Sequence, residues 1–164
     1  MKRYVELFRI PNVWVLLIAC FPARVAYGMV GLSIFFKAEQ STGSIAFAGI
    51  AIGLNAAAGS FTAGIRGSIM DKYGQTWPLR IMVPGYAAMA FALNAMHSKP
   101  LMLIFAFAMG LSAPPINLSV RPLWKIVVPE DFLRTAYAMD TAIMSTAGVV
   151  GPVIATSLAL SSHP

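Results

Sequence analysis

The 164-residue sequence contains few charged residues and a single cysteine. Only 11% of its residues are charged, against roughly 25% in an ordinary soluble domain, and 58% are hydrophobic. The lone Cys20 excludes an intrachain disulfide. Histidine, cysteine and the acids show no metal-ligand spacing, and the sequence has neither a Gly-x-Ser-x-Gly motif nor a phosphate-binding loop. The sequence therefore predicts no enzyme, no metal and no cofactor.

Long apolar runs dominate the sequence instead. Each is long enough to cross a hydrocarbon core of about 30 Å as an α-helix, and the mean hydropathy is +0.73. We predict an all-α membrane protein in the lipid bilayer, with residues 1–164 forming one transmembrane helical domain. The five predicted spans cover residues 12–36, 45–66, 78–96, 101–120 and 136–160. Pro114-Pro115 predicts a kink in the fourth span, and residues 121–135 are predicted to form the longest loop.

The net charge of +6 raises the question of nucleic-acid binding. We predict no nucleic-acid partner, because basic residues do not form a stripe with interleaved aromatics. They follow the positive-inside rule, which places the N-terminus in the cytoplasm and, with five spans, the C-terminus outside. The nine bases on the cytoplasmic side are Lys2, Arg3, Arg9, Arg66, Lys72, Arg80, Arg121, Lys125 and Arg134, against Lys37 and Lys99 on the other side.

Arg24 lies near the middle of the first predicted span, roughly 20 Å from either end, where its side chain cannot reach water by snorkelling. An unpaired cation at that depth is costly, so a partner or water is expected. The counter-ion could be an anionic substrate, a group on a partner, or water in a cavity. We predict a substrate-binding role for Arg24, with a structural pairing as the alternative. Asp140, about one turn into the fifth span, could pair with Arg66, Arg121 or Arg134 at the cytoplasmic rim, and this structural pairing is favoured over proton carriage.

Two motifs carry small residues at characteristic spacing. Gly67, Asp71, Lys72 and Gly74 are predicted to form a tight charged loop between the second and third spans. The fifth span contains a candidate helix-packing motif at Gly148, Gly151 and Pro152. The second span adds small residues four apart at Gly49 and Gly53, which allow close helix packing.

In order, spacing and place in the topology, these motifs resemble those of the major facilitator superfamily, in particular the N-terminal half of bacterial drug-efflux-type members. The cytoplasmic signature of the family is Gly-x-x-x-Asp-[Arg/Lys]-x-Gly-[Arg/Lys]-[Arg/Lys]. Its first four fixed positions match here, whereas its last two basic positions are Gln75 and Thr76. The resemblance implies that Gly67, Asp71, Lys72 and Gly74 gate the conformational change, with Asp71 latching onto a helix end of a second half. It also implies a multi-pass protein of the bacterial inner membrane.

Two functions remain open at this point. The resemblance implies part of a secondary-active transporter that moves a small molecule by alternating access between two six-helix halves. Because the sequence has five predicted spans, the chain would need a second transporter half. The alternative is a degenerate transporter half that serves as a structural or assembly subunit of a larger membrane complex.

Overall fold

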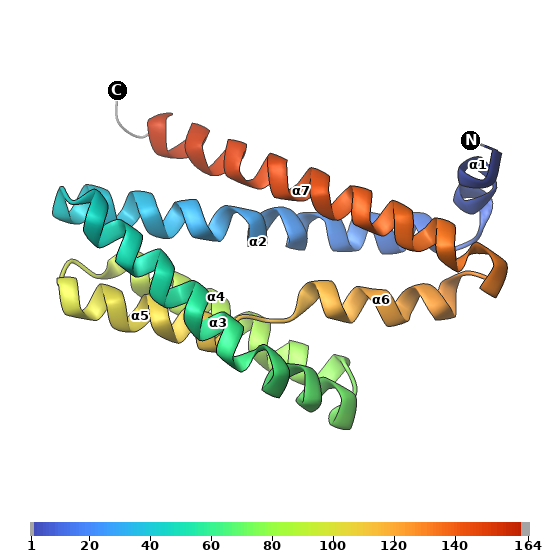
Figure 1. The fold of residues 1–164 in the computed structure, drawn as a ribbon, viewed down its shortest axis with the longest axis horizontal. Helices are drawn as coiled ribbons and strands as arrows, with labels where there is room; N and C mark the ends of the chain where they lie inside the picture. The colour runs from blue at the N-terminus through green and yellow to red at the C-terminus, as the bar shows by residue number, and fades with distance from the viewer. Residues whose placement is uncertain (1, 162–164) are drawn as a thin grey trace. The chain divides into compact units, whose positions relative to one another are not determined.

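The computed structural model describes residues 2–161, and within them every element of secondary structure is helical (Figure 1). The all-α prediction is therefore confirmed. The elements are α1 (Lys2–Arg9), α2 (Val13–Thr42), α3 (Ile45–Tyr73), α4 (Thr76–Ala95), α5 (Lys99–Ser112), α6 (Ile116–Val127), the short 3-10 helix η1 (Glu130–Phe132) and α7 (Leu133–Ser161).

Four segments of the described chain are long and apolar enough to cross a membrane. They are Val13–Thr42, Ile45–Tyr73, Lys99–Val127 and Glu130–Ser161. These segments contain four of the five predicted spans. The remaining prediction, 78–96, corresponds to the helix α4, which is not one of the four candidates. Arg80, Asn94 and Pro84 lower the hydropathy of α4, so the five-span prediction is not confirmed for this helix.

Several helices extend beyond the predicted spans. The first span was predicted to end at residue 36, but α2 continues to Thr42. Gly43 then turns the chain with a φ of 66°, and Ser44 caps α3 by accepting a hydrogen bond from the Phe47 amide at 3.2 Å. The polar residues before Ser44 are thus mostly helical. Polar side chains cost little free energy at the end of a long helix, because that end extends beyond the apolar part of the span.

The predicted break at Pro114-Pro115 is confirmed, since α5 ends at Ser112 and α6 begins at Ile116. The loop predicted over residues 121–135 is wrong over most of its length. α6 occupies its first half up to Val127, and η1 and the start of α7 occupy most of the second. Charged residues suggested a loop there, but on α6 they lie on the exposed side of an amphipathic helix.

The chain divides into two compact units, each described here separately. The first contains residues 1–30 and 116–164, and in it α1, α6 and η1 all contact α7 (Figure 1). Its apolar core surrounds Trp124, whose side chain is completely buried. The other buried members of this core are Leu7, Val13, Leu16, Leu17, Val120, Val128 and Ala136.

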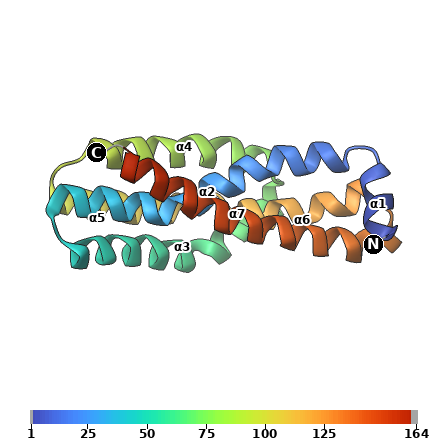
Figure 2. The ribbon, with the colours of Figure 1, turned by 90° about the horizontal axis from the view of Figure 1, so that it is seen from above.

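The second unit, Gly31–Pro115, is built around the pairing of α3 with α5, and α4 also packs against α5 (Figure 2). The two helices approach very closely at Gly110, where an added Cβ would collide with the backbone of Asn55 and the side chain of Ala58. Next to this contact, the Asn55 side-chain amide donates a hydrogen bond to the Ala106 carbonyl at 2.9 Å. Small residues and a polar bond between helices are typical of packing in lipid, where burial of apolar surface gives little driving force.

Large apolar side chains remain exposed on several helices. Phe61 is 86% exposed, Ile126 81% and Phe91 77%. A soluble monomer rarely leaves so many large apolar side chains in water. Surrounding lipid accounts for them, in agreement with the apolar lengths of the candidate spans.

Candidate functional site

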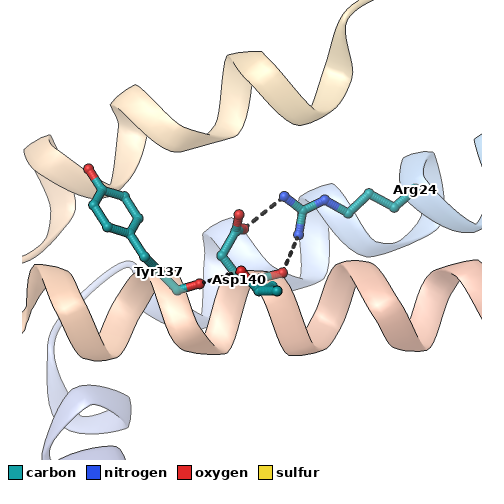
Figure 3. A network of polar contacts seen from close by, with 4 residues as sticks. Arg24, Tyr137 and Asp140 are labelled. Carbon is teal, nitrogen blue, oxygen red and sulfur yellow. Dashed lines mark hydrogen bonds and ion pairs between the residues drawn. The ribbon is translucent and has the colours of Figure 1, made fainter.

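An ion pair between Arg24 on α2 and Asp140 on α7 lies buried in the first unit (Figure 3). One terminal nitrogen of Arg24, Nη2, donates to the Asp140 carboxylate oxygen Oδ1 at 2.7 Å. The other, Nη1, donates to the backbone carbonyl of the same residue at 3.3 Å. Each residue is only 5% exposed. Arg24 therefore has the partner that its depth required, and the partner is a carboxylate of the same chain.

This partner differs from the one predicted. Asp140 was expected to pair with Arg66, Arg121 or Arg134, and the structure pairs it with Arg24 instead. The helix register explains the difference. Gly28 of α2 contacts Ala147 and Gly151 of α7, which places Arg24 beyond Asp140 along the axis, by roughly 5–10 Å at 1.5 Å per residue.

The length of the arginine side chain closes this gap. Side chains on a helix lean toward its N-terminus, and Arg24 extends in that direction along α7 (Figure 3). Counting residues from the helix ends placed Asp140 too shallow, because such a count takes no account of how far the guanidinium extends.

The guanidinium is not fully satisfied. Arginine carries five N–H donors, and the Nε atom of Arg24 is buried without a hydrogen-bond partner among residues 2–161. A buried donor without a partner costs free energy. The Nε–H of Arg24 is therefore a buried donor that lacks an acceptor within the described chain.

α2 and α7 cross in direct backbone contact next to this pair. A Cβ built on Gly151 would lie 2.7 Å from the Val25 carbonyl oxygen and 3.0 Å from the Gly28 Cα. Pro152 also borders the contact, since its Cδ lies 3.7 Å from a Cβ built on Gly28. Gly148, by contrast, has nothing within 4 Å among the described residues. Gly151 is thus the glycine of the predicted packing motif that makes the helix contact seen here, and Gly148 lies on an open face.

A second buried cation, Arg66 on α3, binds backbone carbonyls in the second unit. Its Nη1 donates to the carbonyl of Gly110 at 3.2 Å and also to that of Ala113, and its Nη2 donates to the carbonyl of Gly59. α5 ends at Ser112, so the carbonyls of its last turn lack the donors of a continuing helix, although that of Gly110 also accepts a hydrogen bond from the Ala113 amide at 3.4 Å. Arg66 therefore caps the end that the two prolines create.

This role was not predicted, because Arg66 was interpreted only as a cytoplasmic base and a candidate partner of Asp140. A signal was present in the sequence. Pro114-Pro115 removes two backbone donors and frees carbonyls inside a membrane span, so a donor on another helix is required. The residue that supplies it could be found only from the structure.

The four residues of the predicted gating motif lie at the end of α3 and directly after it. They were predicted to form a loop after residue 66, but α3 continues to Tyr73, so Gly67, Asp71 and Lys72 are helical. Of these four residues, Gly74 alone turns the chain, with a φ of 73° that favours glycine. The sequence suggested an earlier end because glycine is common in loops, but it is also frequent within membrane helices.

The side chains of Asp71 and Lys72 are exposed. The Lys72 ammonium lies 5.3 Å from the centre of the Tyr73 ring, within cation–π distance. Lys72 also lies in the last turn of α3, where a cation is favoured by the helix dipole. Asp71 in the same turn is unfavourable for its own helix, because its charge has the same sign as the C-terminal end of the dipole.

Residues 2–161 contain no group of three or more His, Cys, Asp or Glu side chains that could hold a metal ion. The buried charges of the described chain are Arg24, Arg66 and Asp140. Two of these three form the α2–α7 pair, and the third is bound to carbonyls. The Arg24–Asp140 pair is therefore the candidate functional site.

The apolar helices, with a charged pair buried between two of them, indicate a multi-pass membrane protein. No protein-family model matches the chain, and no solved structure matches it. The chain is 29% identical over 166 residues to a protein of Sinorhizobium fredii described as the uncharacterized MFS-type transporter y4rN, where MFS denotes the major facilitator superfamily. The match covers 94% of this chain and 40% of that protein. The chain therefore spans less than half the length of this relative.

Proposed function

We propose that the chain is part of a secondary-active transporter of the major facilitator type, which moves a small molecule across the bacterial inner membrane by alternating access. The observation that carries this proposal is the Arg24–Asp140 pair, buried between two helices that are each long enough to span a membrane. Ionisable residues at such positions are expensive and usually serve substrate or ion movement. Similarity to an MFS-type protein along 94% of the chain supports the same function.

In this proposal Arg24 binds the substrate, and Gly67, Asp71, Lys72 and Gly74 form the conformational gate. The placement of Asp71 supports its role. The carboxylate is exposed at the negative end of its own helix, where it does not stabilise α3. It is therefore available to the positive N-terminal end of a helix in a second transporter half.

The second half is a proposed partner, whether it is carried by the same polypeptide or by another. The relative is more than twice the length that this chain matches, which leaves room for a second bundle. Gly49, Gly53 and Gly64 on α3 and Gly148 on α7 have nothing within 4 Å among the described residues, so they could accept another helix closely. The excess of bases on one side places the N-terminus in the cytoplasm in this proposal, with the C-terminus of a five-span bundle outside.

One observation favours the alternative, a structural or assembly subunit of a larger membrane complex. Arg24 is neutralised by Asp140, and a closed ion pair can serve packing alone. In that case the open glycines would pack against other subunits, and the chain would move no solute.

Transport can be tested without knowing the substrate. A strain that lacks the gene is complemented with the full-length wild-type protein, with Asp71→Asn, or with the matched control Asp131→Asn, an exposed acid on η1. Small molecules in the cells and in the medium are then compared by mass spectrometry. We expect wild type and Asp131→Asn to shift the distribution of at least one small molecule severalfold, and Asp71→Asn to abolish the shift at an equal amount of protein in the membrane.

Equal small-molecule profiles in all strains would refute transport. Stable copurification of the wild-type protein with a large membrane complex would then support the subunit function. A shift that persists in Asp71→Asn would leave transport standing but would refute the gating role of that residue.

A further inference from the structure

We infer that the Nε edge of Arg24 binds one carboxylate-type monoanion and that Asp140 takes up one proton when the anion binds. This inference rests on the proposed transport function for its purpose, and it assigns the substrate class and the coupling ion. It would make transport an electroneutral movement of one anion with one proton. The geometry of the pair, its charge balance and the surrounding charges each support a part of it.

The first step concerns the donors of Arg24. The present pair uses one hydrogen bond from Nη2 to the Asp140 side chain and one from Nη1 to the Asp140 backbone. Neither uses Nε, which is buried and without a partner within the described chain. A guanidinium presents its N–H groups as a planar fork that matches the two oxygens of a carboxylate. An incoming carboxylate can therefore use the free Nε–H together with an Nη donor.

The second step concerns charge. Arg24 and Asp140 together have a net charge of zero, and both side chains are at least nine-tenths buried. Adding an anion would leave one uncompensated negative charge in a medium of low dielectric constant, which is strongly unfavourable. If Asp140 takes a proton as the anion binds, the site holds a cation, an anion and a neutral acid, and its net charge remains zero. The proton binds to a carboxylate oxygen, and no other bond forms or breaks.

The third step concerns the surroundings, since another group could supply the proton or the charge. On α2, Cys20 lies close enough to sense the charges of both members of the pair, and Tyr27 is 42% exposed. On α7, the ring of Tyr137 points away from the guanidinium (Figure 3).

The other charged side chains of the first unit are all exposed among its described residues. They are Lys2, Arg3, Glu6 and Arg9 on α1, Arg121 and Lys125 on α6, Glu130 and Asp131 on η1, and Arg134 on α7. Asp140 is therefore the only buried acid of this unit, which makes it the group that must respond when the charge at Arg24 changes.

The inference is tested by anion binding to the full-length protein in lipid nanodiscs, with benzoate as the probe. Calorimetry in two buffers of different ionisation enthalpy gives both the affinity and the number of protons taken up. We expect wild type to take up about one proton per benzoate, so its affinity should fall about tenfold for each pH unit in the range where Asp140 is ionised. The anion itself stays ionised over this range, so the proton must come to the protein.

The variants assign the two roles separately. Asp140→Asn should bind benzoate at least as tightly as wild type, without proton uptake and without pH dependence, because the site already holds a neutral group. Arg24→Gln should weaken binding by about tenfold or more, since a charge-assisted bond is lost. Lys125→Gln, which removes an exposed cation of α6, is the matched control and should behave as wild type. Asp140→Asn retains or gains binding in this scheme, so misfolding cannot produce the expected result.

Several outcomes would overturn the inference: no benzoate binding, binding to wild type without proton uptake, unchanged binding in Arg24→Gln, or loss of binding in a folded Asp140→Asn. The test is independent of transport. A protein that shows proton-linked binding but moves no solute would refute the proposed function alone. Transport of a solute without proton-linked anion binding would refute this inference alone.

Discussion

Replacing Gly151 with alanine should destabilise the contact between α2 and α7, although alanine is the better helix former. An added Cβ would lie 2.7 Å from the Val25 carbonyl oxygen and 2.9 Å from the Gly28 carbonyl carbon. Both atoms belong to the backbone and cannot rotate away. Because ordinary contacts of this kind begin at 3.4 Å, the two helices must separate by several tenths of an ångström.

Two opposing terms set the size of the effect. Alanine in place of glycine within a helix gains roughly 0.5–1 kcal/mol. Overpacking a tight contact costs about 1–3 kcal/mol. Gly151→Ala should therefore be less stable than wild type by about 0.5–2 kcal/mol. Gly148→Ala, three residues earlier on the same helix, meets nothing within 4 Å and should be neutral or slightly more stable.

The measurement is thermal unfolding of the full-length protein in one detergent, followed by circular dichroism, with wild type and both variants side by side. The expected order of melting temperature is Gly148→Ala at or above wild type, and wild type above Gly151→Ala. The reverse order for the two variants would refute the close contact between α2 and α7.

Two further predictions each concern one buried side chain, Arg66 in the second unit and Trp124 in the first. Arg66→Met keeps the apolar stem but removes the donor of the Ala113 carbonyl and one of the two donors of the Gly110 carbonyl, so it should lower stability by about 1–3 kcal/mol, whereas Arg80→Met, at an exposed position, should change it by less than about 0.5 kcal/mol. Trp124→Ala should cost about 3–5 kcal/mol, because it removes the largest completely buried side chain of the described residues. Denaturant titration of each variant checks both predictions, and a Trp124→Ala protein as stable as wild type would contradict the position of that residue in the core.

Sequence reasoning located the charge that needed a partner but not the partner. The depth of Arg24 within an apolar run was enough to predict that it needs a partner or water, because an unpaired cation at that depth is costly. Identifying Asp140 required the register between α2 and α7, which close contact at two glycines determines. That register is a property of two helices packed together, and neither helix sequence contains it alone.

The ends of the helices were also predicted in some places and not in others. Pro114-Pro115 predicted a break correctly, because proline acts through its own missing donor and its ring. Gly67 led to a wrong loop prediction, because glycine permits a turn without requiring one, and α3 continues through it to Tyr73. Pro114-Pro115 indicated that carbonyls would lose their donors, but nothing in the sequence identified Arg66 as the residue that binds them.

The glycine contact and the ion pair lie on the same two helices, so the spacing of the helices and the charge of the site depend on each other. Direct backbone contact at Gly28 and Gly151 sets the separation over which Arg24 must meet Asp140. A wider crossing lengthens the 2.7 Å bond between their side chains and weakens the attraction that holds the Arg24 guanidinium to Asp140. Gly151→Ala should therefore bind benzoate more tightly than wild type at alkaline pH, whereas Gly148→Ala should not. If both variants bind benzoate as wild type does while Gly151→Ala is less stable, the crossing serves packing alone, and the charge of the site is independent of it.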